Sequence, residues 1–164
     1  IFDTLMEAGE EFNIKPFGIR AMDSLRIEKS YRLVGTELSI EYAGYESGLD
    51  RFIHPNKGQF IGRDALVEWK EKGFDNIFIT LEVHDVTDAD ALGNNPIYSD
   101  GQVIGRATGG NYGFRVQKSI ALAMVRPEFS QIGTKLQMDI LGTIHNVTVI
   151  EESPFDPENH KLRS

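Results

Sequence analysis

The chain has 164 residues, of which 40% are hydrophobic, and 25 acidic against 17 basic residues give a formal net charge of -8. This length is enough for one ordinary core or two small ones. The acidic balance argues against a nucleic-acid partner, which would require a basic face. The absence of cysteine excludes disulfides, thiolate nucleophiles and thiolate metal sites, and it fits a reducing compartment.

No apolar run approaches the length of a membrane span, so we expect no membrane partner. The first residues, from Ile1 to Thr4, lack the basic and apolar parts of a signal peptide. The chain begins with Ile1 rather than methionine, and we expect it to be a piece of a longer polypeptide.

Two helices are predicted in the first 74 residues. Asp3 can cap the first helix, and Pro16 with Gly18 would close that segment. Its apolar residues at helical spacing are Leu5, Met6 and Phe12. The second helix is predicted over residues 63–72, with an acid in its first turn, lysines in its last turn and glycines on both sides. Residues 30–48 favour short strands and loops.

From residue 76 onward the pattern changes to short apolar runs separated by turn residues. The predicted strands are residues 77–83, 102–108, 119–125, 135–141 and 144–150. Residues 100–101 and 141–143 are credible hairpin turns, and residues 85–95 are predicted to form a surface loop. A series of short strands separated by turns is typical of a small antiparallel barrel or sandwich. We therefore predict an α+β protein with one unit at residues 1–74 and a second at 75–164.

The usual signatures of metal and nucleotide sites are missing. The histidines are scattered, and no pair has the spacing that places two imidazoles on one helical face, so we predict no metal site. No Gly-x-Ser-x-Gly elbow or phosphate-binding loop is present. The glycines between positions 105 and 113 do not form Gly-x-Gly-x-x-Gly and are interpreted as turn and bulge positions.

A basic stretch stands out in this acidic chain. Its cations are Arg20, Arg26, Lys29 and Arg32. Interleaved acids at positions 23 and 28 favour a network of internal ion pairs that holds this segment together. The alternative is a local positive field that receives an anionic ligand. Both interpretations remain open at the level of sequence.

Six short stretches, in this order, resemble the second half of the folate-binding aminomethyltransferase family, which includes the glycine-cleavage T-protein. They are DSLRIEK at 23–29, ESGL at 46–49, FIGRDAL at 60–66, GQVIG at 101–105, QKSIA at 117–121 and SPFDP at 153–157. The resemblance implies the end of a folate-binding domain followed by a C-terminal β-barrel. It also implies that the catalytic carboxylate and the pterin-binding glutamate lie upstream, so that this chain holds no catalytic residue.

Three positions correspond to folate contacts of the family, and each departs from the T-protein pattern. Met22 stands where that branch has an arginine before the Asp-Ser-Leu-Arg run. Arg51 replaces an aromatic residue, and His160 matches a tyrosine after Pro-Phe. These three are the folate-binding residues that the resemblance implies. Arg51 has an alternative role, because it can pair with neighbouring acids at positions 46 and 50.

The lack of an arginine at position 22 makes the sequence more similar to the dimethylglycine and sarcosine dehydrogenase branch, whose members also lack it. The resemblance then implies an enzyme that moves a one-carbon unit from an N-methyl amine to tetrahydrofolate, with FAD in a domain outside this chain. The resemblance implies that folate and the small N-methyl amine bind through the upstream domain. It also implies a location in the cytoplasm, or in the mitochondrial matrix of a eukaryote. The alternatives are a stand-alone aminomethyltransferase, a folate-dependent demethylase, or a non-catalytic barrel that docks partner domains.

Overall fold

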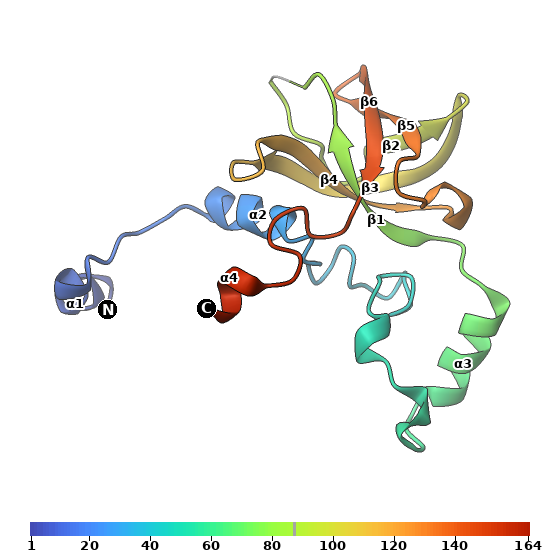
Figure 1. Cartoon of the computed structure of the whole chain (residues 1–164), viewed down its shortest axis with the longest axis horizontal. Coiled ribbons are helices and arrows are strands. Elements are labelled where there is room, and N and C mark those ends of the chain that lie inside the picture. Colours follow the sequence, from blue (N-terminus) through green and yellow to red (C-terminus); the bar gives the residue numbers. More distant parts are fainter. Residues whose placement is uncertain (87) are drawn as a thin grey trace.

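The computed structural model describes residues 1–86 and 88–164, and its main body is a closed barrel of antiparallel strands (Figure 1). The order around the barrel is β1-β4-β3-β2-β5-β6, and β6 pairs back with β1. The strands are β1 (Ile77–Val83), β2 (Pro96–Ser99), β3 (Gln102–Gly113), β4 (Lys118–Val125), β5 (Lys135–Ile140) and β6 (Thr143–Ile150). The α+β class with a small antiparallel barrel is confirmed.

The two predicted hairpin turns join β2 to β3 and β5 to β6. Asp100 and Gly101 both have positive φ, of 49° and 76°, and Leu141 and Gly142 have φ of 52° and 85°. Two central residues with positive φ match the twist of the flanking strands. The predicted loop at 85–95 contains no helix or strand in its described part, while Thr87 lies outside the described residues.

Strand β4 is buried on both of its faces, which explains its continuous apolar run. Ala121, Ala123 and Val125 belong to the core inside the barrel. Leu122 and its outward-facing neighbours belong to a second core, which consists of Ile27, Phe78, Ile120, Leu122 and Met124. The barrel therefore needs a cover over the outside of β1 and β4.

Helix α2 (Ile19–Glu28) is part of that cover and contacts β3 and β4. This helix is not among the elements predicted from the sequence. Its buried residues are Ser24, Ile27 and Glu28, so two of the three positions that face the protein interior are polar and no apolar stripe marks the helix. Ser24 donates from Oγ to the carbonyl of Tyr112 at 2.7 Å, which explains one of these polar positions.

Residues 30–48 complete the cover, but the strands expected there are absent from this described segment, which has only an isolated bridge between Val34 and Leu38. Buried carboxylates stabilise its turns instead. Glu37 accepts from the backbone N–H of Leu33 at 2.8 Å, and Glu46 accepts from that of Ala43 at 2.8 Å. Backbone groups that strands would have paired are thus satisfied locally.

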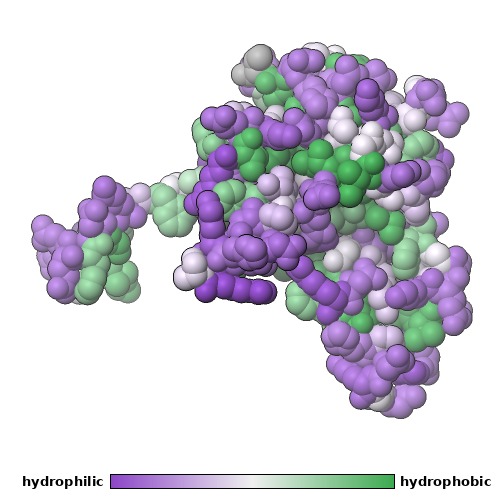
Figure 2. All heavy atoms as spheres, viewed as in Figure 1, coloured by the Kyte–Doolittle hydropathy of each residue, from purple (hydrophilic) through white to green (hydrophobic). Residues whose placement is uncertain are grey.

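The first helix is shorter than predicted. Helix α1 covers Phe2–Ala8 with Ile1 as its N-cap, a 3-10 turn (Glu10–Phe12) follows, and Asp3 lies inside the first turn without a side-chain capping bond. Gly9 is the C-cap, and the close return of the chain requires glycine there, because a Cβ would lie 2.5 Å from Cγ2 of Ile14. The arm formed by α1 and the 3-10 turn lies apart from the barrel in Figure 1, and Figure 2 shows apolar side chains in the open on it.

Helix α3 covers Arg63–Lys72, as predicted, between Gly62 and Gly73. None of its residues is buried. The short elements that remain are the 3-10 turns Asp50–Phe52, Pro55–Lys57 and Pro127–Phe129, and helix α4 (His160–Arg163). The division between residues 74 and 75 stays a prediction.

Candidate functional site

A groove lies where the end of α2 meets the segment that follows β6. The backbone N–H of Phe155 donates to the carbonyl of Glu28 at 3.1 Å. Ser153 donates from Oγ to the carbonyl of Lys29 at 2.7 Å, and its N–H donates to Oγ of Ser30 at 3.1 Å. These bonds satisfy carbonyls that a helix end leaves unpaired, and they fix the C-terminal segment against α2.

Lys29 strengthens the same junction. Its Nζ donates to the carbonyls of Phe155 and Asp156, at 3.2 and 2.6 Å, and to Oδ1 of Asn159 at 2.8 Å. A lysine ammonium has three protons, so these three acceptors use its whole donor capacity. Lys29 therefore holds the segment in place rather than presenting its charge to a ligand.

The groove has a volume of about 280 Å³ and is bounded by α2, Tyr31, the β3–β4 turn and the C-terminal segment. Leu25, Tyr31, Phe155 and Leu162 supply apolar surface. Arg115 also lines it, with its guanidinium 4.7 Å from the centroid of the Phe155 ring. These walls suit a ligand that has an apolar body.

The acids of the groove are engaged with the backbone. Glu28 is buried, and its Oε1 accepts from the N–H of Arg115 at 2.6 Å. Asp156 accepts from the N–H of His160 at 2.9 Å and from that of Lys161 at 3.2 Å. With both carboxylates occupied in this way, the groove is arranged for binding and offers no acid–base pair for catalysis.

Two of the three predicted folate contacts lie on the elements that form this groove. Met22 is on α2, one turn before Leu25, with 46% of its surface exposed. His160 begins α4, next to Lys161, which lines the groove. Arg51 is elsewhere, in the 3-10 turn Asp50–Phe52, where its guanidinium lies 4.9 Å from the ring of Phe52. The folate-binding role of all three stays a prediction.

The basic stretch forms an internal network at two more of its positions. Arg26 contacts Asp23 at 3.3 Å and donates to the carbonyl of Tyr31 at 2.7 Å. Arg32 donates to Ser47 and pairs with Glu152, while its guanidinium lies 3.9 Å from the ring of Phe78. The ion-pair interpretation therefore applies to Arg26 and Arg32, while Lys29 donates to carbonyl and amide oxygens instead. Sequence reasoning missed Arg115 and Lys161, because nothing in the sequence shows that their two segments meet at the ring of Phe155.

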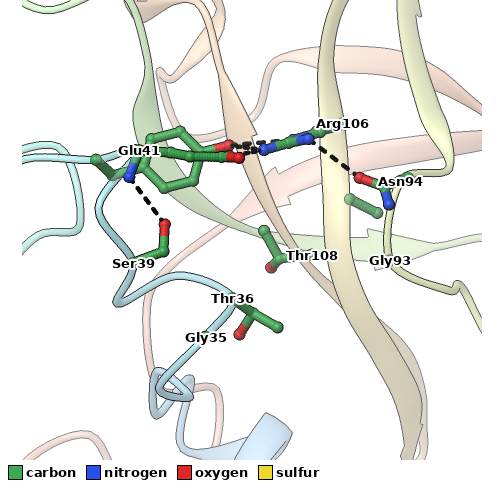
Figure 3. A pocket seen from close by; sticks show the side chains of 10 residues that line it. Gly35, Thr36, Ser39, Glu41, Gly93, Asn94, Arg106 and Thr108 are labelled. Atoms are coloured by element: carbon green, nitrogen blue, oxygen red, sulfur yellow. Dashed lines mark hydrogen bonds and ion pairs between the residues drawn. The ribbon is translucent and has the colours of Figure 1, made fainter.

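A second cavity, of about 230 Å³, lies between residues 35–42 and β3 (Figure 3). On one side Arg106 donates to Tyr42 Oη at 2.7 Å and to Asn94 Oδ1 at 3.2 Å, and it pairs with Glu41. The hydrogen bond to Tyr42, and then the contact with Glu41, raise the pKa of Arg106.

Glu37 lies at the same junction and is 1% exposed. Burial alone would raise the pKa of Glu37, but hydrogen bonds from Thr108, Thr36 and the backbone together lower it. The polar groups of this second junction thus satisfy one another. They tie residues 35–42 to β3.

The described residues contain neither a membrane-spanning helix nor a cluster of metal-binding side chains. No helix in it combines the length and apolar character that a membrane crossing needs. Residues 1–86 and 88–164 also contain no cluster of three or more acidic or histidine side chains that would hold a metal ion.

Known proteins resemble this chain along most of its length. The family described as glycine cleavage T-protein C-terminal barrel domain matches residues 77–156, and the GCVT N-terminal domain matches residues 1–57. The mitochondrial dimethylglycine dehydrogenase of Rattus norvegicus is 37% identical over 155 residues, which are 93% of this chain and 18% of that relative. An aminomethyltransferase of Thermoanaerobacter pseudethanolicus is 31% identical over 161 residues, 98% of this chain and 43% of the relative.

A crystal structure of the glycine cleavage system aminomethyltransferase T from Bartonella henselae has a TM-score of 0.76 and 22% identity, and the match covers 84% of this chain and 38% of that one. This likeness concerns the fold alone. The chain spans less than half the length of each of these proteins. The barrel, the cover that precedes it and the two adjacent family matches agree: the chain belongs to the glycine cleavage T-protein family.

Proposed function

We propose that this chain forms one wall of a folate-binding cavity in an enzyme that passes a one-carbon unit from an N-methyl amine, of the dimethylglycine or sarcosine type, to tetrahydrofolate. The groove beside α2 carries this proposal, because it combines apolar walls with a positively charged rim. A reduced folate has the matching character, since its aromatic body ends in carboxylates.

The residues of this chain would bind and orient the folate and would exclude water. Tetrahydrofolate, when bound, supplies the nitrogen atoms that accept the one-carbon unit. The carboxylates of the groove, Glu28 and Asp156, accept backbone N–H groups, so the groups that move protons are assigned to sequence outside these 164 residues. Oxidation of the amine, with FAD, is assigned there as well, since the dehydrogenase relatives are more than five times longer than the matched region.

Met22 and His160, on elements that form the groove, and Arg51, in the 3-10 turn Asp50–Phe52 outside it, are the proposed folate contacts of this chain. Met22 has the exposed apolar surface that packing against a ring requires. The barrel would close the cavity against water, which protects a reactive one-carbon intermediate from hydrolysis. The compartment that this function favours is the mitochondrial matrix in a eukaryote and the cytoplasm in a bacterium.

A stand-alone aminomethyltransferase is the second candidate. It is favoured by the bacterial aminomethyltransferase that matches 98% of this chain at 31% identity. The two candidates differ in their need for a flavin. Flavin absorbance of the full-length protein, and oxidation of dimethylglycine or sarcosine by it, therefore separate them.

The test is folate binding by the full-length protein encoded by the gene, measured calorimetrically with a stable reduced folate. We expect Met22→Ala and Arg51→Ala each to weaken binding about threefold to tenfold. Ile132→Ala, at an exposed position of the barrel, is the control and should bind as wild type does. A docking module would lose assembly in the first two variants and keep its folate affinity, and that outcome would overturn the proposal.

A further inference from the structure

Two cations in the groove beside α2 have no acidic partner among the described residues: Arg115 and Lys161. Both lie against one aromatic ring. The guanidinium of Arg115 is 4.7 Å from the centroid of Phe155, and Nζ of Lys161 is 5.1 Å from it. Cation–π contact attracts each charge to the ring. The two like charges still repel each other, and an anion bound beside them would offset that repulsion.

The charge balance of the groove points the same way. Its charged lining residues are Glu28, Lys29, Arg115, Asp156 and Lys161, which sum to one positive charge in a chain of net charge -8. Lys29 is saturated by three oxygen acceptors, and the two carboxylates accept backbone N–H groups. Arg115 and Lys161 are thus the cations with donors left for a ligand.

The backbone that carries Arg115 is held rigidly. Its N–H donates to the buried Glu28, and that of Val116 donates to the same oxygen at 3.4 Å. The preceding Gly113 has no room for a side chain, because a Cβ there would lie 2.8 Å from Val116 Cγ2 and 3.0 Å from Glu28 Cγ. A side chain on such a fixed turn is preorganised for binding.

The size and walls of the groove define the rest of the ligand. A volume of about 280 Å³ is slightly below the range that encloses a drug-sized molecule, so the groove takes part of a larger ligand. Leu25, Tyr31 and Leu162 offer apolar surface beside the two cations. This combination selects an aromatic or apolar body that ends in a carboxylate.

We infer that Arg115 and Lys161 bind the glutamate carboxylates of the reduced folate, with the aminobenzoyl ring against Leu25, Tyr31 and Leu162. This inference rests on the proposed function and assigns the anionic tail to residues other than Arg51. Arginine contacts a carboxylate through two parallel N–H donors, and the adjacent ammonium adds a point charge.

The test uses the full-length protein with two probes: a stable reduced folate, and a tetrahydropterin that lacks the aminobenzoyl-glutamate tail. Arg115→Gln and Lys161→Gln should each weaken folate binding about tenfold. Binding of the tail-free pterin should not change. The Arg115→Gln substitution keeps the backbone N–H that donates to Glu28, so the turn is expected to keep its fold.

Arg126→Gln is the matched control. Arg126 also stacks on an aromatic ring, Phe129 at 5.2 Å, but it is paired with Glu128 and does not line the groove. Wild-type affinity for folate in both Arg115→Gln and Lys161→Gln would overturn the inference and leave the proposed function standing. Equal losses for folate and for the tail-free pterin would also overturn it, since they would indicate a structural role. Wild-type protein that binds neither probe would overturn the proposed function itself.

Discussion

The barrel with its cover and the outlying helices bury their side chains to very different degrees. Strands β1 and β4 and the cover at residues 19–48 share a second core around Leu122. By contrast, no residue of α1 or α3 is buried, and Leu5 is 60% exposed. The covered barrel is thus held by its own buried contacts, whereas α1 and α3 have no buried side chain of their own.

The cover depends on buried carboxylates as well as on apolar packing. Glu28, Glu37 and Glu46 are each at most 3% exposed, and each accepts at least one backbone N–H. A carboxylate can be buried when donors replace its lost water. Because these bonds require specific partners, they fix the position of the cover on the barrel more sharply than apolar contact alone.

The largest effect is expected at the shared second core. Leu122→Ala removes a side chain that is 0% exposed and leaves a cavity between β4 and the cover, so the free energy of unfolding should fall by about 3 kcal/mol. Urea unfolding of the 164-residue chain measures this loss. Leu141→Ala, at an exposed hairpin turn, should change the same quantity by less than about 0.5 kcal/mol. Equal losses at the two leucines would mean that the cover is not part of the folded unit.

A smaller effect is expected at Glu37. Replacing it by Gln should lower the free energy of unfolding by about 1 to 2 kcal/mol at pH 7, because an amide cannot accept all the donors that meet the carboxylate. The folded state lowers the pKa of Glu37, so its charged form is the one that the fold favours. The stabilisation is full above the pKa of an unfolded glutamate, about 4.3, and is lost as pH falls through the lower folded pKa.

The difference in unfolding free energy between wild type and Glu37→Gln, followed from pH 7 to pH 3, isolates this residue from the other acids. It should shrink below about pH 4. A difference that stays constant over this range would show that Glu37 contributes through packing rather than through its charge.

The sequence was a good guide to the barrel and a poor one to its cover. Strands and hairpin turns carry local signals, such as the apolar run of β4 and the turn Asp100–Gly101. Helix α2 carries none, because Ser24 and Glu28 occupy its buried face for reasons that exist only once the end of β3 and the β3–β4 turn lie beside it. Local pattern cannot predict a polar residue whose hydrogen-bond partner lies far away along the chain.

The candidate site divides in the same way. The resemblance pointed to Met22, Arg51 and His160. Met22 and His160 lie on elements that form the groove, whereas Arg51 lies elsewhere, in the 3-10 turn Asp50–Phe52. Arg115 and Lys161 escaped prediction because only the tertiary structure brings them to the ring of Phe155. A binding site assembled from segments far apart in the chain has no sequence spacing to detect. Arg115 and Lys161 can be recognised as a pair only once the structure shows which side chains contact them.

The smallest effect is expected in the outlying arm. Leu5→Ala should change the free energy of unfolding of the 164-residue chain by less than about 0.5 kcal/mol, because the Leu5 side chain is 60% exposed and no residue of α1 is buried. In the full-length protein the same substitution should lower stability by about 2 kcal/mol or more if this face packs against flanking sequence. Glu7→Ala on the same helix is the control. An equally small effect in both lengths would mean that the exposed apolar face of α1 contacts no part of its own polypeptide.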